Sequence, residues 1–132
     1  MVVHARRAFE EAIAELRRLP GLTGVVHSFA GSEEQARQLA DVGFLIGIGG
    51  PVTYERAQRL RRVAAHAPVE TLLLETDAPD QPDADHRGER NEPARILRVL
   101  EVVAGLRGVA PDVIARATTA NAERLFRLPS AA

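Results

Sequence analysis

The feature that most constrains the fold of this chain is a regular alternation between short apolar runs and longer amphipathic segments. The first amphipathic segment, over residues 5–19, has helical periodicity, with Phe9, Ile13 and Leu16 at i, i+4 and i+7. Strands alternating with helices predict right-handed βαβ units, a parallel sheet and hence an α/β fold. An open doubly wound sheet and a barrel fit this order equally well, although four strands are too few to close a barrel. The predicted strands cover residues 2–4, 24–29, 44–49 and 71–77.

Capping residues predict where the next two helices begin and end. Ser32 is followed three residues later by Gln35, which is the spacing of a capping box, and Gly43 ends the helix that this box opens. Thr53 is a candidate N-cap for a third helix that runs to about Ala65.

The character of the sequence changes after the fourth predicted strand. Residues 78–92 have no periodicity, and loops of this length in a compact domain are often functional. Pro93 is well placed as the first residue of a helix that Gly108 ends. Pro111 and Asn121 are predicted to begin two short closing helices.

The composition is that of a globular protein of the cytoplasm, with residues 1–132 forming a single domain. Hydrophobic residues make up 45% of the chain and charged residues 27%, and the net charge is −1. This near-neutral charge argues against tight non-specific binding of nucleic acid. There is no cysteine, which excludes disulfides and cysteine-ligated zinc. No apolar run approaches the roughly 20 residues of a membrane span, so we expect no membrane association.

Three polar residues are placed where α/β proteins build their sites. His4, His27 and Asp77 each end a predicted strand, and the carboxyl ends of parallel strands meet at one edge of a sheet. Two imidazoles and one carboxylate form a partial ligand set for a divalent metal ion. The alternative is that these strand-end residues hydrogen-bond to nearby loops. The sequence pattern alone leaves both interpretations open.

Neighbouring residues extend this candidate site. Glu75 lies two residues before Asp77, on the same side of the predicted strand, where it either orients a metal ligand or is buried against an arginine. Arg6 follows His4 by two residues and is a candidate for contacting a substrate phosphate, with a surface arginine as the alternative. Arg90 lies in a charged stretch that either contacts phosphate or caps the following helix.

The remaining histidines and glycines carry weaker signals. His66, at a predicted helix end, is expected on the surface, and His86 is expected to be a solvated loop histidine. Gly47, Gly49 and Gly50 lack the dinucleotide-binding spacing, so we expect them to allow close packing and a tight turn.

A series of motifs in this order resembles the TatD family of metal-dependent hydrolases, over nearly the whole chain. The combination of Glu-Thr-Asp-Ala-Pro with Arg-Asn-Glu-Pro is specific. The motifs are Val3-His4-Ala5-Arg6, Val26-His27-Ser28-Phe29-Ala30-Gly31, residues 43–53, Leu73-Leu74-Glu75-Thr76-Asp77-Ala78-Pro79, Arg87-Gly88-Glu89-Arg90-Asn91-Glu92-Pro93 and residues 118–126.

The resemblance implies a TIM-barrel fold of which this chain holds the last four βα units and the C-terminal helices. It also implies hydrolysis of phosphodiester bonds, with DNA as the usual substrate and a divalent ion such as magnesium, manganese or zinc as cofactor. His4 and His27 match metal-ligand histidines of the family. Asp77 matches the aspartate that binds metal and helps activate the attacking water, and Glu75 would support it.

The chain departs from the family pattern at its beginning. The family has a His-x-His pair and a metal-binding glutamate that would lie upstream of Met1, and we expect the coding sequence to continue there. Without those ligands, the alternative function is a non-catalytic half-barrel that self-associates or pairs with a separate N-terminal half. Its open sheet edges would have to be covered.

Overall fold

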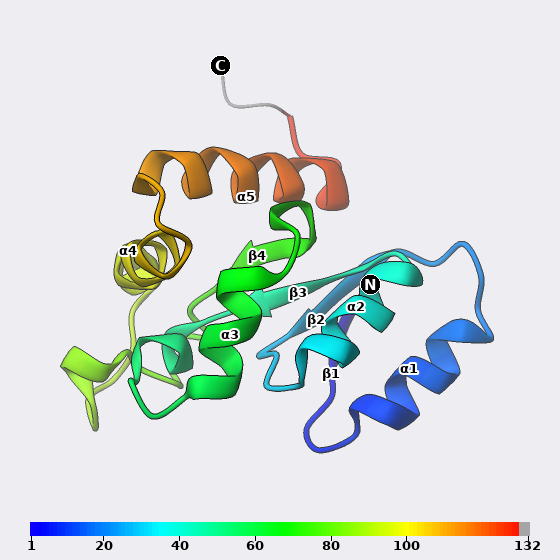
Figure 1. The fold of residues 1–132 in the computed structure, drawn as a ribbon, viewed down its shortest axis with the longest axis horizontal. Helices are drawn as coiled ribbons and strands as arrows, with labels where there is room; N and C mark the ends of the chain where they lie inside the picture. Colours follow the sequence, from blue (N-terminus) through cyan, green and yellow to red (C-terminus); the bar gives the residue numbers. More distant parts are fainter. Residues whose placement is uncertain (130–132) are drawn as a thin grey trace.

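The computed structural model describes residues 1–129 and contains one four-stranded parallel sheet (Figure 1). The strands lie in sequence order, so each pairs only with its neighbours in the chain. Val26 is level with Val3 on one side, and Ile46 is level with Val26 and with Leu72. The predicted α/β fold with a parallel sheet is therefore confirmed. The strands are β1 (Val2–His4), β2 (Gly24–His27), β3 (Phe44–Ile48) and β4 (Leu72–Leu74).

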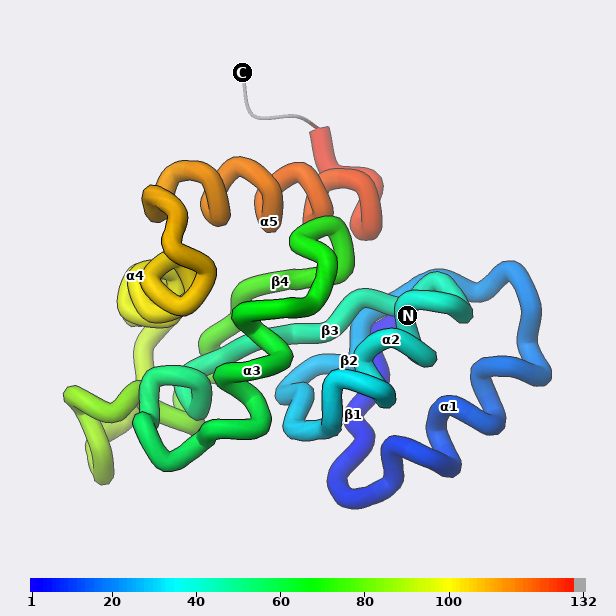
Figure 2. The backbone as a smooth tube through the Cα atoms, viewed as in Figure 1, coloured from blue at the N-terminus to red at the C-terminus, as the bar shows by residue number. Residues whose placement is uncertain are grey.

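The five α-helices of residues 1–129 form a continuous layer in which each helix packs against the next (Figure 2). Helix α2 packs on β3, and α5 packs on β4. The core between sheet and helices includes fully buried Val26, Ile46 and Leu72 from the strands. The helices are α1 (Phe9–Arg17), α2 (Glu33–Asp41), α3 (Gln58–His66), α4 (Ile96–Arg107) and α5 (Pro111–Phe126).

The capping signals predict some helix boundaries correctly and others not. The Ser32 and Gln35 capping box is present at the start of α2, and Gly108 ends α4 in the left-handed conformation at φ +65°. Thr53 is not the N-cap of α3, because it lies in a buried 3₁₀ turn, Gly50–Thr53. Its hydroxyl donates to Gly50 O and accepts from Ala84 N, so its side chain is used to join two loops.

The predicted pair of closing helices is also wrong, since α5 is a single helix from Pro111 to Phe126. Asn121, predicted to begin a new helix, is buried in the middle of α5. Its Nδ2 donates to Val69 O at 2.8 Å and to Leu72 O at 2.9 Å. A tertiary contact thus explains a residue that helix capping alone would place at a terminus.

The helix after the long loop starts with a 3₁₀ turn, Pro93–Arg95, which runs directly into α4. The fourth predicted strand is shorter than residues 71–77, because β4 ends at Leu74 and Asp77 has a left-handed backbone, φ +58°. The strand therefore stops before its two carboxylates.

Both outer strands leave one edge of the sheet open within the described chain, since the order is β1-β2-β3-β4. Apolar side chains are exposed near both edges, among them Val2 at 61% and Phe126 at 46%. Beside β4 lies an apolar groove of about 320 Å³, lined by α4 and α5 residues such as Leu97 and Phe126. No helix within residues 1–129 is long and apolar enough to cross a membrane.

Candidate metal centre

The sheet brings two of the predicted metal ligands into direct contact. His4 ends β1 and His27 ends β2, and the two residues are level in the parallel register. Their side chains therefore leave the sheet on the same face. His4 Nδ1 lies 2.8 Å from His27 Nε2, and the ring centroids are 4.8 Å apart.

The predicted carboxylates lie against the other ring nitrogen of His27. Asp77 Oδ1 is 3.9 Å from His27 Nδ1, and Glu75 Oε1 is 4.0 Å from the same atom. All three side chains are at least two-thirds buried. His27 thus stands between His4 on one side and two carboxylates on the other.

Glu75 reaches His27 by crossing β3 at a glycine. A Cβ built on Gly47 would lie 2.1 Å from Glu75 Oε2, so the carboxyl group occupies the space that any other residue would fill. The backbone N–H of Ser28 donates to Glu75 Oε1 at 2.5 Å. Burial raises the pKa of the Glu75 carboxyl, and this hydrogen bond together with His27 offsets only part of the effect. The partner of Glu75 is therefore a backbone amide and not an arginine.

Two residues that sequence reasoning missed complete this group. Gln81 Nε2 donates to Asp77 Oδ2 at 2.5 Å and to Ser28 Oγ at 2.9 Å. Ser28 Oγ also lies 3.2 Å from His27 Nδ1. We call His4, His27, Ser28, Glu75, Asp77 and Gln81 the strand-end cluster.

Three members of the strand-end cluster have strained backbones. Ser28, Asp77 and Gln81 have φ angles of +49°, +58° and +50°, a region that residues other than glycine rarely adopt. Such strain persists where surrounding structure enforces it, and it concentrates at functional sites. No motif in the sequence marks Gln81. A serine directly after a strand-end histidine was the one available signal for Ser28.

An open cleft of about 890 Å³ adjoins the cluster on the side of β1. His4, Ser28 and Gln81 line it, and the predicted phosphate-binding residue Arg6 is also in its wall. Arg7 and Arg59 add two further positive charges, while Glu10 and Glu11 add negative ones. The predicted residue Arg90 is exposed in the long loop and is not among the residues that line this cleft.

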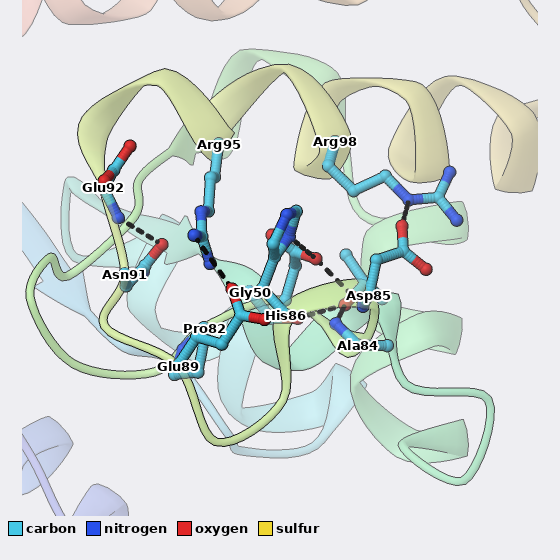
Figure 3. A network of polar contacts seen from close by, with 12 residues as sticks. Gly50, Pro82, Ala84, Asp85, His86, Glu89, Asn91, Glu92, Arg95 and Arg98 are labelled. Atoms are coloured by element: carbon cyan, nitrogen blue, oxygen red, sulfur yellow. Dashed lines mark hydrogen bonds and ion pairs between the residues drawn. The ribbon is translucent and has the colours of Figure 1, made fainter.

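A second polar group holds the long loop in place (Figure 3). The Asp83 side chain is 1% exposed, and His86 Nδ1 lies 3.0 Å from its Oδ1. Asn91 Nδ2 donates to Thr76 O and Asp80 O, both at 2.7 Å. We call Thr53, Asp83, His86 and Asn91 the loop cluster.

The loop cluster explains several residues of the charged stretch. His86 is 41% exposed, as expected for a loop histidine, but a buried carboxylate anchors it. Burial raises the pKa of Asp83, but hydrogen bonds from His86 and from the Asp85 N–H outweigh it and leave this pKa below its ordinary value.

His66, predicted at the surface, is exposed and lies 2.9 Å from Glu33 Oε1.

The donor atoms of the strand-end cluster suit a divalent metal in kind, although the described chain holds no finished site. Within residues 1–129 no three His, Asp or Glu side chains are gathered around one point. Two nitrogen ligands on one tetrahedral ion stand about 3.4 Å apart, so the two imidazoles would have to separate by roughly 0.6 Å. The two imidazoles therefore fit such an ion after a small movement, whereas Asp77 faces the opposite ring nitrogen of His27.

Comparisons with known proteins identify the family. The family of TatD related DNases matches residues 1–127, and the chain belongs to that family. The uncharacterised metal-dependent hydrolase YjjV of Escherichia coli K12 is 43% identical over 98% of this chain and 50% of its own length. The 3'-5' ssDNA/RNA exonuclease TatD of Erwinia billingiae is 42% identical over 97% of this chain and 52% of its own length.

Solved structures agree with the sequence matches. The crystal structure of YjjV superposes with a TM-score of 0.92 at 42% identity, covering 97% of this chain and 50% of that one. A TatD family hydrolase from Entamoeba histolytica has the same fold, with a TM-score of 0.81 at 22% identity over 98% of this chain and 51% of that one. The chain thus spans about half the length of the relatives it matches, and its sheet is a partial barrel of four βα units.

Proposed function

We propose that this chain supplies part of a divalent-metal site that hydrolyses phosphodiester bonds. His4 and His27 would be metal ligands, and Asp77 would be both a ligand and the base that accepts a proton from the attacking water. The observation that carries this proposal is the 2.8 Å approach of His4 Nδ1 to His27 Nε2 at the carboxyl edge of the sheet. Relatives at about 40% identity are named metal-dependent hydrolases, which supports the same chemistry.

The residues of the strand-end cluster have complementary roles in this chemistry. A divalent ion held by these residues would lower the pKa of a bound water molecule and so make it a better nucleophile for phosphorus. Asp77 accepts the proton through Oδ1, the oxygen that faces His27. Glu75 keeps His27 oriented from the face of the sheet, and the guanidinium of Arg6 binds a phosphate in the adjoining cleft. Arg90 is a second candidate for phosphate, reached from the loop.

The substrate that we propose is a short single-stranded nucleic acid. One relative is named an exonuclease of single-stranded DNA and RNA, and the cleft beside His4 carries Arg6, Arg7 and Arg59. The net charge of −1 favours a few local phosphate contacts over tracking along a duplex. Zinc and manganese suit the nitrogen and carboxylate donors, and magnesium would be bound through carboxylate and water oxygens.

Metal binding and hydrolysis should be measured on the same preparations. Titration calorimetry with Mn²⁺ and Zn²⁺ is expected to show binding that His27→Gln reduces at least tenfold. Release of nucleotides from a short single-stranded DNA is expected to fall at least a hundredfold in Asp77→Ala. Asp112→Ala, which removes an exposed carboxylate on α5, is the matched control. Equal hydrolysis by Asp77→Ala and Asp112→Ala would contradict the proposal.

The open edges of the sheet favour a second candidate function, that of a half-barrel module that pairs with a copy of itself. Exposed Val2 lies at the β1 edge, and the apolar groove with Leu97 lies at the β4 edge. If β4 of each copy paired with β1 of the other, eight parallel strands would close, which is the number in a TIM barrel.

Sedimentation velocity tests this pairing. A dimer that Leu97→Asp converts to monomer would support it, with the exposed Val113→Asp as control for the added charge. A monomer at all concentrations would exclude self-pairing. If the chain forms a complex only after a separate polypeptide with the upstream barrel units is added, then the open sheet edges pair with that polypeptide and not with a second copy.

A further inference from the structure

Gln81 connects the long loop to the strand ends through one amide group. Its Nε2 lies 2.5 Å from Asp77 Oδ2 and 2.9 Å from Ser28 Oγ. The nitrogen, and not the oxygen, must face Asp77, because an ionised carboxylate can only accept hydrogen bonds. The loop approaches closely here because Gly50 has no side chain, and a Cβ on it would lie 2.3 Å from Gln81 O.

The hydrogen bonds at Ser28 Oγ can be assigned by counting donors and acceptors. A serine hydroxyl has one proton to donate and two lone pairs that accept. One lone pair accepts from Gln81 Nε2. The proton can go to Asp77 Oδ2, 3.4 Å away, or to His27 Nδ1, 3.2 Å away. The hydroxyl donates to Asp77 Oδ2, so the second lone pair accepts from His27.

This assignment places the proton of His27 on Nδ1. The surroundings of that nitrogen agree, because Asp77 Oδ1 and Glu75 Oε1 both face it at about 4 Å. Two carboxylates stabilise an N–H that points towards them and disfavour a bare lone pair. The lone pair of His27 is therefore on Nε2, where it accepts a hydrogen bond from His4 Nδ1 in the metal-free chain.

We propose that Ser28 and Gln81 are positioning residues: together they fix His27 as its Nδ1–H tautomer, so that Nε2 is free to ligate, and they hold Asp77 by Oδ2. Asp77 Oδ1 is then the oxygen left for a metal or for the proton of a water. The part of this inference that concerns ligation rests on the proposed function, while the tautomer is a property of the metal-free chain. Histidine ligands are commonly oriented in this way through their second nitrogen.

The tautomer is measured directly by ¹⁵N NMR of the histidine ring at pH 8 without metal. The chain has four histidines, and His27→Gln identifies the signals of His27 by their loss. The expected result is protonated Nδ1 and unprotonated Nε2 in the unaltered chain. Ser28→Ala is expected to shift the population towards the Nε2–H form, and Gln81→Met, which keeps the length of the side chain, to shift it in the same direction by less.

Gln38→Met is the matched control, because Gln38 is a half-buried residue of α2 outside the strand-end cluster, and its side chain bonds to Glu34. It is expected to leave the His27 signals unchanged. An Nε2–H tautomer in the unaltered chain would overturn the inference. So would a tautomer population that stays the same in Ser28→Ala and in Gln81→Met, provided that the amide spectra show both variants to be folded. If Ser28→Ala unfolds the chain, Gln81→Met alone decides.

Metal titration separates this inference from the proposed function. Ser28→Ala is expected to weaken Zn²⁺ binding by about 10- to 100-fold, the usual effect of losing a group that orients a ligand. An unaltered chain with the predicted tautomer and no metal binding would contradict the proposed function and leave the positioning role intact. If Ser28→Ala and Gln81→Met leave the affinity for Zn²⁺ unchanged, then the positioning of His27 does not affect its ligation of metal, and this part of the inference is wrong.

Discussion

The strand-end cluster and the loop cluster lie at the same edge of the sheet, but they are built in opposite ways. In the loop cluster, Asp83 and Asn91 are almost fully buried, and their side chains bond to backbone groups and to His86. In the strand-end cluster, His27 and Asp77 keep a quarter to a third of their side-chain surface exposed. That cluster also holds two carboxylates near one imidazole.

The polar groups of the loop cluster stabilise the fold, whereas the fold has to hold the polar groups of the strand-end cluster in place. The loop cluster adopts ordinary backbone angles, and its hydrogen bonds replace those lost to burial. Three residues of the strand-end cluster have left-handed backbones, and Glu75 keeps a raised pKa. We infer that substitutions in the loop cluster reduce stability, whereas substitutions in the strand-end cluster mainly change binding. Four substitutions test this difference, in order of decreasing effect on the free energy of unfolding.

Asn91→Ala is expected to have the largest effect. It removes the donor for Thr76 O and Asp80 O and leaves two part-buried hydrogen bonds unmade, so we expect a loss of about 3 kcal/mol in the free energy of unfolding. Urea denaturation followed by circular dichroism measures it, with Gln38→Ala, at a half-buried position of α2 outside both clusters, as control. If the loss for Asn91→Ala exceeds that for Gln38→Ala by less than about 0.5 kcal/mol, which is the size of an ordinary surface effect, then Asn91 does not anchor the loop.

Asp83→Asn is expected to destabilise by about 2 kcal/mol at pH 7, because charge-assisted hydrogen bonds from His86 and the Asp85 N–H are weakened. The folded pKa of Asp83 lies below its ordinary value of 3.8. Its stabilisation is therefore fully present above that ordinary value and is lost as the pH falls through the folded pKa.

Unfolding measured from pH 6 down to pH 2 tests the sign of this effect. The difference in stability between the unaltered chain and Asp83→Asn should be constant above about pH 5 and shrink below the ordinary pKa of 3.8. A difference that grows as the pH falls would contradict the assignment.

Gly47→Ala is expected to cost about 1 kcal/mol, because the added Cβ must displace the flexible end of Glu75 and lies 3.2 Å from His27 Cα. The amide proton of Ser28 reports the displacement, since losing the 2.5 Å bond to Glu75 should move its NMR signal upfield. Gly105→Ala is the matched control. That glycine is in α4 with open space around it, so alanine there should stabilise by about 0.5–1 kcal/mol.

Asp77→Asn is expected to have the smallest effect on stability, within about 0.5 kcal/mol, because asparagine tolerates the left-handed backbone and can still accept from Gln81. Metal affinity should nevertheless fall, since a charged ligand becomes neutral. Asp83→Asn is the same chemical change in the loop cluster, so the two variants compare the clusters directly. A larger loss of stability for Asp77→Asn than for Asp83→Asn would reverse the distinction between them.

The sequence predicts the sheet well because strand formation here depends on short apolar runs between amphipathic segments, a local signal. It predicts His4 and His27 as neighbours for the same reason, since parallel strands bring their ends to one edge. The family resemblance points to the same residues and adds the partial barrel, which alternation alone left open beside a doubly wound sheet.

Contacts between distant residues explain what the sequence did not predict. Gln81 joins the site because the loop folds back over Gly50, a close approach that no local pattern encodes. Thr53 and Asn121 have residue types that favour helix termini, but their side chains bond to Ala84 N and Leu72 O. Such polar residues satisfy backbone groups wherever the fold brings them, so propensity alone misplaces them.

The contact between Asn121 and the start of β4 has a consequence for the order of folding during synthesis. Asn121 donates to Leu72 O in β4 and to Val69 O in the turn before it, so these carbonyls find their partner some fifty residues later in the chain. A ribosome that has just released β4 has not yet made α5. The strand must therefore wait, without the helix that packs on it, for roughly 3–10 seconds at the usual rates of chain elongation. We expect chaperones that bind nascent apolar segments to be engaged during this interval.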